Sequence, residues 1–243
     1  MRLRVLGSSS KGNCYLLYND SEVLVIEAGV KFSAIKEALN FDFSKVVGVL
    51  CTHEHKDHAL SVKDFLEAGI NVIAPESVFE SVGINSPCCV RVKENHTVTL
   101  RNFSVQPFAL QHDVPIYGYL IHHEEMGNTV FITDTGDINY SFKNLNNIIV
   151  EANFSDSILV RNAIDGLGYT NEKRLRDTHL SLEKCVDWLS AVDLKNVNNI
   201  VLIHLSERNS DAEMFKETVE KQFAKNVYVA DKGLDIDFNR IPF

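Results

Sequence analysis

The sequence predicts an α/β fold in which two β-sheets pack face to face and helices cover their outer sides. Short β-rich runs bounded by turn residues dominate the first half of the chain. Segments with one apolar helical face lie between and after them. No internal repeat, low-complexity tract or linker divides the 243 residues, so we expect a single domain over residues 1–243.

The predicted strands are short runs rich in β-branched, aromatic and aliphatic residues. In chain order they are Arg2–Leu6, Tyr15–Tyr18, Val23–Ile26, Val46–Cys51, Val72–Ala74, Phe103–Leu110, Tyr117–Ile121 and Thr129–Thr133. Two more apolar β-rich runs end at Glu151 and Ile203.

Three segments place apolar residues on one helical face. These faces consist of Ala59, Val62, Phe65 and Leu66, of Leu182, Val186 and Leu189, and of Ala212, Phe215, Val219 and Phe223. Ser181 is the predicted N-cap of the second helix. Ser210 and Glu213 have capping-box spacing at the start of the third.

The charge balance argues against a broad basic face that grips nucleic acid, because 33 acidic residues outnumber 24 basic ones and the net charge is −9. The negative net charge is still compatible with an enzyme that binds phosphate through metal ions and a few cationic side chains. We expect no membrane partner, since no apolar run approaches the length of a span. The five cysteines lack CxxC spacing and indicate reduced thiols in a cytoplasmic protein.

A histidine-rich segment directly follows the predicted strand Val46–Cys51. It places His53, His55 and His58, three of the nine histidines, within six positions together with Asp57. Neutral imidazole and carboxylate are ligands of borderline divalent metals. The alternative is a solvated polar loop, but this density of histidine favours a metal site.

Three further candidate ligands each follow an apolar β-rich run. His112 comes after residues 108–111, Asp134 after residues 130–133 and His204 after residues 199–203. Taken alone, each could be a turn or cap residue. Together they place polar side chains where strands leave the core, and such positions hold ligands rigidly.

In this order the motifs resemble the metallo-β-lactamase superfamily over nearly the whole chain. The resemblance implies a four-layer αββα sandwich of two mixed sheets with two divalent metal ions at one edge, zinc or manganese. His53, His55 and His112 would bind the first ion, Asp57, His58 and His204 the second, and Asp134 would bridge them. Open positions would remain for water, as in catalytic sites.

The acid after the third predicted strand departs from the family pattern. The family usually has Asp in a stretch like IDAG, where this chain has Ile26, Glu27, Ala28 and Gly29. That acid generally orients the histidine cluster, and the longer Glu27 could preserve the contact through a backbone adjustment.

The loop Gly7–Asn13 could bind an anionic group through backbone N–H groups, hydroxyls and one lysine. Its candidate substrate-binding residues are Ser9, Ser10, Lys11 and Asn13. A plain Gly/Ser hairpin turn explains the same composition equally well.

Glu151 and the segment around His179 resemble the acid-bearing and histidine-bearing loops of ribonuclease Z. With the Gly/Ser loop and Ser206, they look most like the WalJ/YycJ-type subgroup of small nucleases. The glycine that usually precedes the histidine in this subgroup is Thr178 here. The resemblance implies a nucleic acid or another phosphodiester as the substrate.

The implied reaction is hydrolysis by a metal-activated water. Asp57 would position and deprotonate that water, and His179, oriented by Glu151, would donate a proton to the leaving oxygen. Arg174 and Arg176 could neutralise flanking phosphates, although a solvated helix or loop face is the simpler explanation for both.

Two other functions stay open. A small-molecule hydrolase that opens a lactone, thioester or cyclic phosphodiester fits the acidic charge, and a non-catalytic metal-binding regulator would need a distorted site. The sequence does not choose DNA over RNA, end-wise over internal cleavage, or one metal over another. A homodimer could extend the substrate groove.

Overall fold

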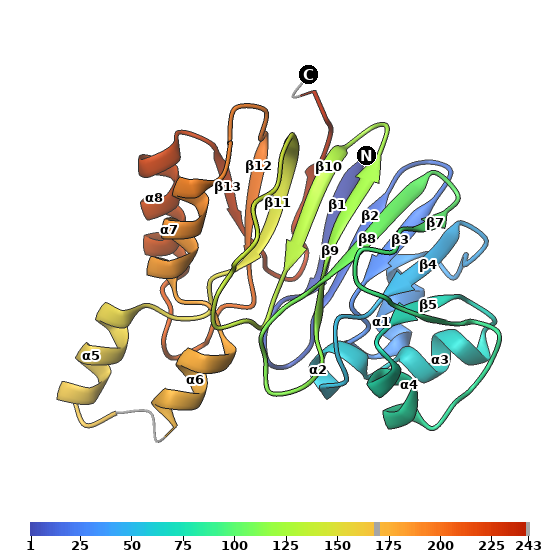
Figure 1. The fold of residues 1–243 in the computed structure, drawn as a ribbon, viewed down its shortest axis with the longest axis horizontal. Helices are drawn as coiled ribbons and strands as arrows, with labels where there is room; N and C mark the ends of the chain where they lie inside the picture. The colour runs from blue at the N-terminus through green and yellow to red at the C-terminus, as the bar shows by residue number, and fades with distance from the viewer. Residues whose placement is uncertain (168–170, 242–243) are drawn as a thin grey trace.

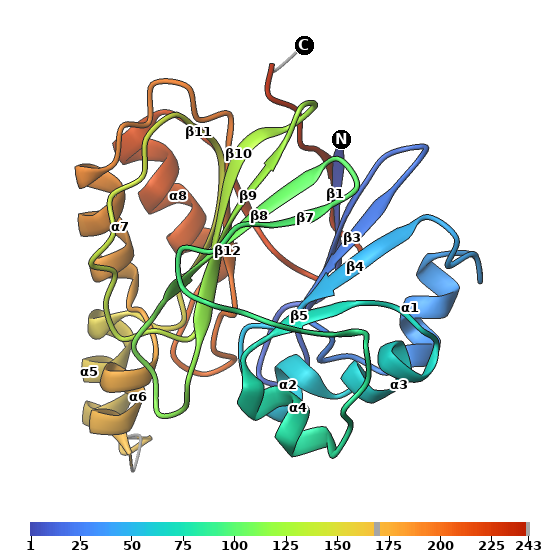
Figure 2. The same ribbon diagram turned by 45° about the vertical axis from the view of Figure 1, so that its right-hand side comes forward.

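The structure, a computed structural model that describes residues 1–167 and 171–241, consists of two seven-stranded mixed sheets packed face to face. Helices cover both outer faces, with α7 and α8 on one side and α1, α3 and α4 on the other (Figures 1 and 2). The predicted four-layer architecture is confirmed.

The strands of the first sheet, in spatial order, are β14 (Asp235–Asp237), β1 (Arg2–Gly7), β2 (Cys14–Tyr18), β3 (Val23–Ile26), β4 (Val46–Leu50), β5 (Val72–Ala74) and β6 (Cys89–Arg91). The second sheet has the order β13 (Asn226–Val229), β12 (Asn199–Ile203), β11 (Leu145–Glu151), β10 (Gly127–Ile132), β9 (Tyr117–His123), β8 (Phe103–Ala109) and β7 (Val98–Leu100). The helices are α1 (Phe32–Ala38), α2 (Lys56–Ala59), α3 (Val62–Glu67), α4 (Glu76–Val82), α5 (Asp156–Ile164), α6 (Glu172–Thr178), α7 (Leu182–Ala191) and α8 (Ala212–Phe223).

Three apolar clusters hold the four layers together. The alternation of side chains along β11 shows how, because Ile149 packs between the sheets while Ile148 and Val150 pack under α7 and α8. A third cluster, which includes Val49 and Phe65, fills the space between the first sheet and its helices. Both sheets are thus covered on both faces, which fixes the positions of their strand ends.

The carboxyl ends of six strands meet at one edge of the sandwich. β3 and β4 are parallel neighbours in the first sheet, and β10, β11 and β12 are parallel neighbours in the second. β8 runs in the same direction as β10, since each is antiparallel to β9. Residues that follow these strands therefore converge on the same edge.

Two helix predictions needed correction. The predicted apolar face from Ala59 to Leu66 is buried, but it belongs to two short helices, α2 and α3. Asp211 is the N-cap of α8, where its side chain accepts the N–H of Met214 at 3.1 Å. Ser210 instead donates its hydroxyl hydrogen to the carbonyl of Ser206. Within the described residues, no helix has the length and apolarity needed to cross a membrane.

Candidate metal centre

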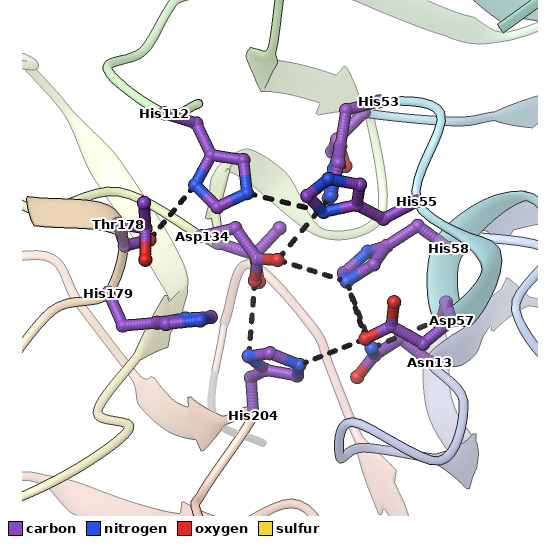
Figure 3. A network of polar contacts seen from close by, with 12 residues as sticks. Asn13, His53, His55, Asp57, His58, His112, Asp134, Thr178, His179 and His204 are labelled. Atoms are coloured by element: carbon purple, nitrogen blue, oxygen red, sulfur yellow. Dashed lines mark hydrogen bonds and ion pairs between the residues drawn. The ribbon is translucent and has the colours of Figure 1, made fainter. Parts of the chain in front are cut away.

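Seven predicted ligands converge at the edge where the strands end (Figure 3). They are His53, His55, Asp57, His58, His112, Asp134 and His204. The first four lie between the end of β4 and the end of α2, so they come from the first sheet, and the other three follow strands of the second. The edge between the sheets is therefore where sequence-distant ligands meet.

One group consists of His53, His55, His112 and Asp134, whose potential ligand atoms all lie within 4.8 Å of one another. His53 Nε2 is 3.5 Å from Asp134 Oδ2, and His112 Nε2 is 3.4 Å from His55 Nδ1. This is the ligand set predicted for the first ion, with the bridging acid included.

The second predicted set, Asp57, His58 and His204, also fits within 4.8 Å. Asp57 Oδ2 lies 3.4 Å from His58 Nε2 and 3.5 Å from His204 Nε2. Asp134 reaches this set too, with Oδ2 3.2 Å from His58 Nε2 and Oδ1 3.1 Å from His204 Nδ1. Its position between both groups is the one that a bridging ligand requires.

Unsatisfied nitrogen atoms show that these groups fit metal ions. His53 Nε2 and His204 Nε2 are buried and have no hydrogen-bond partner among the described residues. Buried polar atoms normally have a partner. A divalent cation would satisfy both lone pairs, and a mixed imidazole and carboxylate set is chemically suited to it.

The pKa values of the group differ from ligand to ligand. Burial would lower the pKa of His58 and His204, but nearby carboxylates raise that of His58 well above its ordinary value and that of His204 to about 10, so both rings would release a proton when they bind an ion. Burial holds the pKa of His53 well below its ordinary value, with His58 adding to the effect, so His53 is neutral and its lone pair is free. Burial alone would raise the pKa of Asp57, but the imidazoles of His204 and His58, 3.5 and 3.4 Å away, hold it well below its usual range. The pKa of Asp134 is likewise lowered against the effect of burial, chiefly by His204 and His58. Both carboxylates are ionised.

Three residues at this edge have left-handed backbone conformations. The φ angles are 62° for Glu27, 49° for Asp134 and 56° for His204. Such angles are uncommon for residues other than glycine and cost free energy. Each residue lies within two positions of a strand end, where the reversed backbone returns its side chain to the edge. Three of the nine left-handed non-glycine residues in the described part of the chain thus lie at the candidate centre.

Glu27 supports histidines of both groups from below. It is fully buried, its Oε1 accepts the hydroxyl hydrogen of Thr52 at 2.6 Å, and the same oxygen is 3.2 Å from His58 Nδ1. Thr52 Oγ1 is also 2.9 Å from His53 Nδ1. The orienting contact expected of Glu27 is therefore present. Sequence reasoning did not single out Thr52, although it directly precedes His53.

Glu151 and His179 form a pair beside these two groups, and with Asp134 and His204 they make a third set whose potential ligand atoms lie within 4.8 Å of one another. Glu151 Oε1 is 2.8 Å from His179 Nδ1 and 2.9 Å from His204 Nδ1. Glu151 Oε2 also accepts the N–H of Leu180 at 3.0 Å. The next residue, Ser181, is the N-cap of α7 as predicted, and its side chain accepts the N–H of Lys184. Burial would lower the pKa of His179, but the Glu151 carboxylate raises it above its ordinary value.

A cavity of about 210 Å³, the metal cavity, opens onto these groups and is lined by predicted substrate-binding residues Ser10, Arg174 and Ser206. Arg174 Nη2 is 2.6 Å from Asp113 Oδ2, and the other oxygen of Asp113 is 3.1 Å from His112 Nε2. Sequence reasoning missed Asp113. Its position directly after His112 was the available signal.

The remaining predicted substrate-binding residues lie elsewhere. Ser9 and Lys11 line a neighbouring cavity, where Lys11 forms an ion pair with Glu207. Asn13 is buried and donates to the carbonyl of Asp57 at 3.2 Å, so it supports the ligands from behind. Arg176 pairs with Asp156 and Glu172 on the far side of α6 and is not among the residues that line the metal cavity.

Comparisons with known proteins agree with this geometry. A family model described as a beta-lactamase superfamily domain matches residues 24–205. Exodeoxyribonuclease WalJ of Streptococcus pneumoniae serotype 2 (strain D39 / NCTC 7466) is 25% identical, over 96% of this chain and 91% of that protein. Exodeoxyribonuclease YycJ of Bacillus anthracis is 23% identical, over 97% of this chain and 94% of that protein.

The fold also resembles solved structures. The metallo-beta-lactamase fold protein YhfI from Bacillus subtilis superposes with a TM-score of 0.71 at 13% identity, and the match covers 97% of this chain and 99% of that one. The family and subgroup resemblances predicted from the motifs are confirmed.

Proposed function

Since the chain belongs to the β-lactamase superfamily, we propose that it is a metal-dependent phosphodiesterase that acts as a nuclease on DNA. The observation that carries this proposal is the Glu151–His179 pair, 2.8 Å between Oε1 and Nδ1, beside a full set of metal ligands. It provides an oriented proton donor in addition to the ligands. The names of the two exodeoxyribonuclease relatives support DNA as the substrate.

Two divalent ions, with zinc the first choice and manganese the second, would be held by the two groups bridged by Asp134. When bound, such ions lower the pKa of a water molecule and offset the negative charge of a phosphodiester. The complete ligand set is what supports a catalytic role over that of a non-catalytic regulator.

Three side chains of the protein would orient the attacking water, protonate the leaving oxygen and bind the phosphate. Asp57 lines the cavity and is ionised, so it accepts a hydrogen bond from the attacking water and orients it. His179 is held by Glu151 through Nδ1, which leaves the Nε2 proton for the leaving oxygen. The raised pKa of His179 keeps that proton on the ring near neutral pH. Arg174 lines the same cavity and contributes a positive charge for a phosphate oxygen.

The test is cleavage of end-labelled single- and double-stranded DNA and RNA by metal-supplemented protein. Asp134→Ala should abolish cleavage and lower the bound metal, whereas Asp187→Ala, an exposed acid on α7, should match the wild type. Retention of cleavage by Asp134→Ala would contradict the proposal, as would a wild-type protein that hydrolyses no phosphodiester.

A small-molecule hydrolase is the second candidate, favoured by the small metal cavity of about 210 Å³ and by the net charge of −9. Turnover of a lactone or thioester far above that of a phosphodiester would establish it instead. Metal analysis with fewer than one ion per chain would favour a regulator.

We also propose that the protein works in the cytoplasm, which is supported by five unpaired cysteines. A homodimer with an extended substrate surface remains a prediction that the molar mass in solution, measured by light scattering, can test.

A further inference from the structure

The metal cavity is too small for a whole nucleotide. It measures about 210 Å³, whereas pockets that bind small organic ligands usually measure roughly 300–1,000 Å³. It can accommodate a phosphate group beside the metal-binding residues. The sugar and base attached to that phosphate must therefore lie in a neighbouring space.

A second cavity of about 580 Å³, the side cavity, adjoins the metal cavity. Leu205 and Ser206 line both cavities, so one opens beside the other. A further link is Ser8, which lines the side cavity and accepts the N–H of the predicted metal ligand His204 at 3.0 Å. The two cavities are thus built on the same strand ends.

The walls of the side cavity suit a nucleoside. Val30, Val229 and Ala230 provide apolar surface against which a base and a sugar can pack. The hydroxyl groups of serines and the ammonium groups of Lys11 and Lys232 provide polar contacts around this surface, together with the carboxyl groups of Glu207 and Asp231. The β1–β2 loop, the loop after β12, the start of α8 and the end of β13 all contribute to its walls.

The ion pair between Lys11 and Glu207 joins two of these walls. Both side chains are largely exposed, 75% for Lys11 and 62% for Glu207. Exposed pairs of this kind contribute little to stability, so the pair can open at little cost. Lys11 can then turn from the Glu207 carboxylate to a phosphate of a bound strand.

We propose that the side cavity binds the terminal nucleotide of a DNA strand while the scissile phosphate occupies the metal cavity. The inference rests on the proposed phosphodiesterase function and adds a reason for end-wise cleavage, because a compact cavity holds one nucleotide. The released product is then a deoxynucleoside monophosphate, which should bind to the same place.

The first experiment uses two alanine methyl groups of the side cavity, those of Ala212 and Ala230. Metal-loaded protein with labelled alanine methyl groups is titrated with inorganic phosphate and then with dAMP or dTMP, and the NMR shifts are recorded. The nucleotides should shift both resonances, whereas phosphate should not, and Ala191 at the end of α7 is the control. Equal responses to phosphate and nucleotide would overturn the inference.

The second experiment narrows the side cavity. Ala212 is exposed and is the first residue of α8, so Ala212→Trp adds bulk without disturbing the core. The ratio of kcat/KM on an oligodeoxynucleotide to kcat/KM on methyl p-nitrophenyl phosphate should fall about tenfold, and dTMP should bind about tenfold more weakly, a change of ~1.4 kcal/mol. Ala191→Trp, also exposed, should leave both values unchanged.

The two levels of the proposal fail in different ways. Wild-type protein that hydrolyses neither substrate contradicts the phosphodiesterase function. Protein that hydrolyses both, with Ala212→Trp indistinguishable from Ala191→Trp, contradicts only the nucleotide site.

Discussion

Replacing Glu27 by Gln exchanges one carboxyl oxygen beneath the candidate metal-ligand histidines for an NH₂ group and keeps the size of the side chain. The wild-type carboxylate accepts the Thr52 hydroxyl hydrogen at 2.6 Å and the Thr52 N–H at 3.3 Å, and it lies 3.2 Å from His58 Nδ1. A glutamine has only one acceptor oxygen. In one orientation its NH₂ group meets the Thr52 N–H, and in the other it meets His58 Nδ1.

The second orientation is the more damaging one for metal binding. An NH₂ group at Nδ1 favours the tautomer of His58 that carries its proton on Nε2, the atom that faces Asp57 and Asp134. Loss of an interaction that orients a ligand typically lowers metal affinity about 10–100-fold. We therefore expect Glu27→Gln to weaken metal binding by ~1.4–2.7 kcal/mol.

Competition with a coloured chelator measures the affinity, and elemental analysis measures the metal content. Glu27→Asp adds a graded comparison, because its carboxylate is one methylene shorter and should lengthen the His58 contact. Far-UV circular dichroism checks that each variant is folded. Wild-type metal affinity in Glu27→Gln would refute the orienting role of this buried acid.

Three further predictions concern stability and substrate binding. Burial would raise the pKa of Glu22, but hydrogen bonds, including one with His123 at 3.0 Å, hold it below its ordinary value. Its stabilising effect is thus fully present above the unfolded-state pKa of about 4.3 and is lost as pH falls through the lower folded pKa. Urea unfolding should show that Glu22→Gln is less stable than the wild type by about 1 kcal/mol at pH 7. This difference in the free energy of unfolding should shrink below pH 4, and a difference that stays constant with pH would contradict the reasoning. Phe215→Ala, which empties a fully buried site under α8, should lower the free energy of unfolding by ~3–5 kcal/mol; a loss below about 1 kcal/mol would show that the site collapses. Arg174→Ala should raise KM on oligonucleotides more than Arg176→Ala does, because only Arg174 lines the metal cavity, and equal effects in steady-state kinetics would argue against a phosphate contact.

The sequence predicted which side chains converge at this edge, because their placement depends on strand ends. An apolar β-rich run followed by His or Asp fixes where the side chain leaves the core, as for Asp134 and His204. Parallel neighbours then bring those ends together without any information on side-chain packing. The four-layer architecture was predicted from the same apolar β-rich runs and from the helical faces between and after them.

Side-chain direction on irregular segments was harder to predict. Arg174 and Arg176 are two positions apart, and their segment forms the helix α6, on which residues at this spacing do not share a face. Asn13 belongs to a loop whose inward turn depends on contacts with the distant Asp57. Ser210 and Asp211 are both good N-caps, so sequence preference alone does not choose between them.

The division of the ligands between the two sheets has a consequence for folding. Four of them come from the first sheet and three from the second, so bound ions would cross-link two halves that otherwise meet through non-directional apolar packing. Stabilisation by such a ligand grows with the logarithm of its free concentration. The melting temperature would then report ion occupancy, and a chelator should loosen the open rim of the sandwich before it disturbs the opposite end.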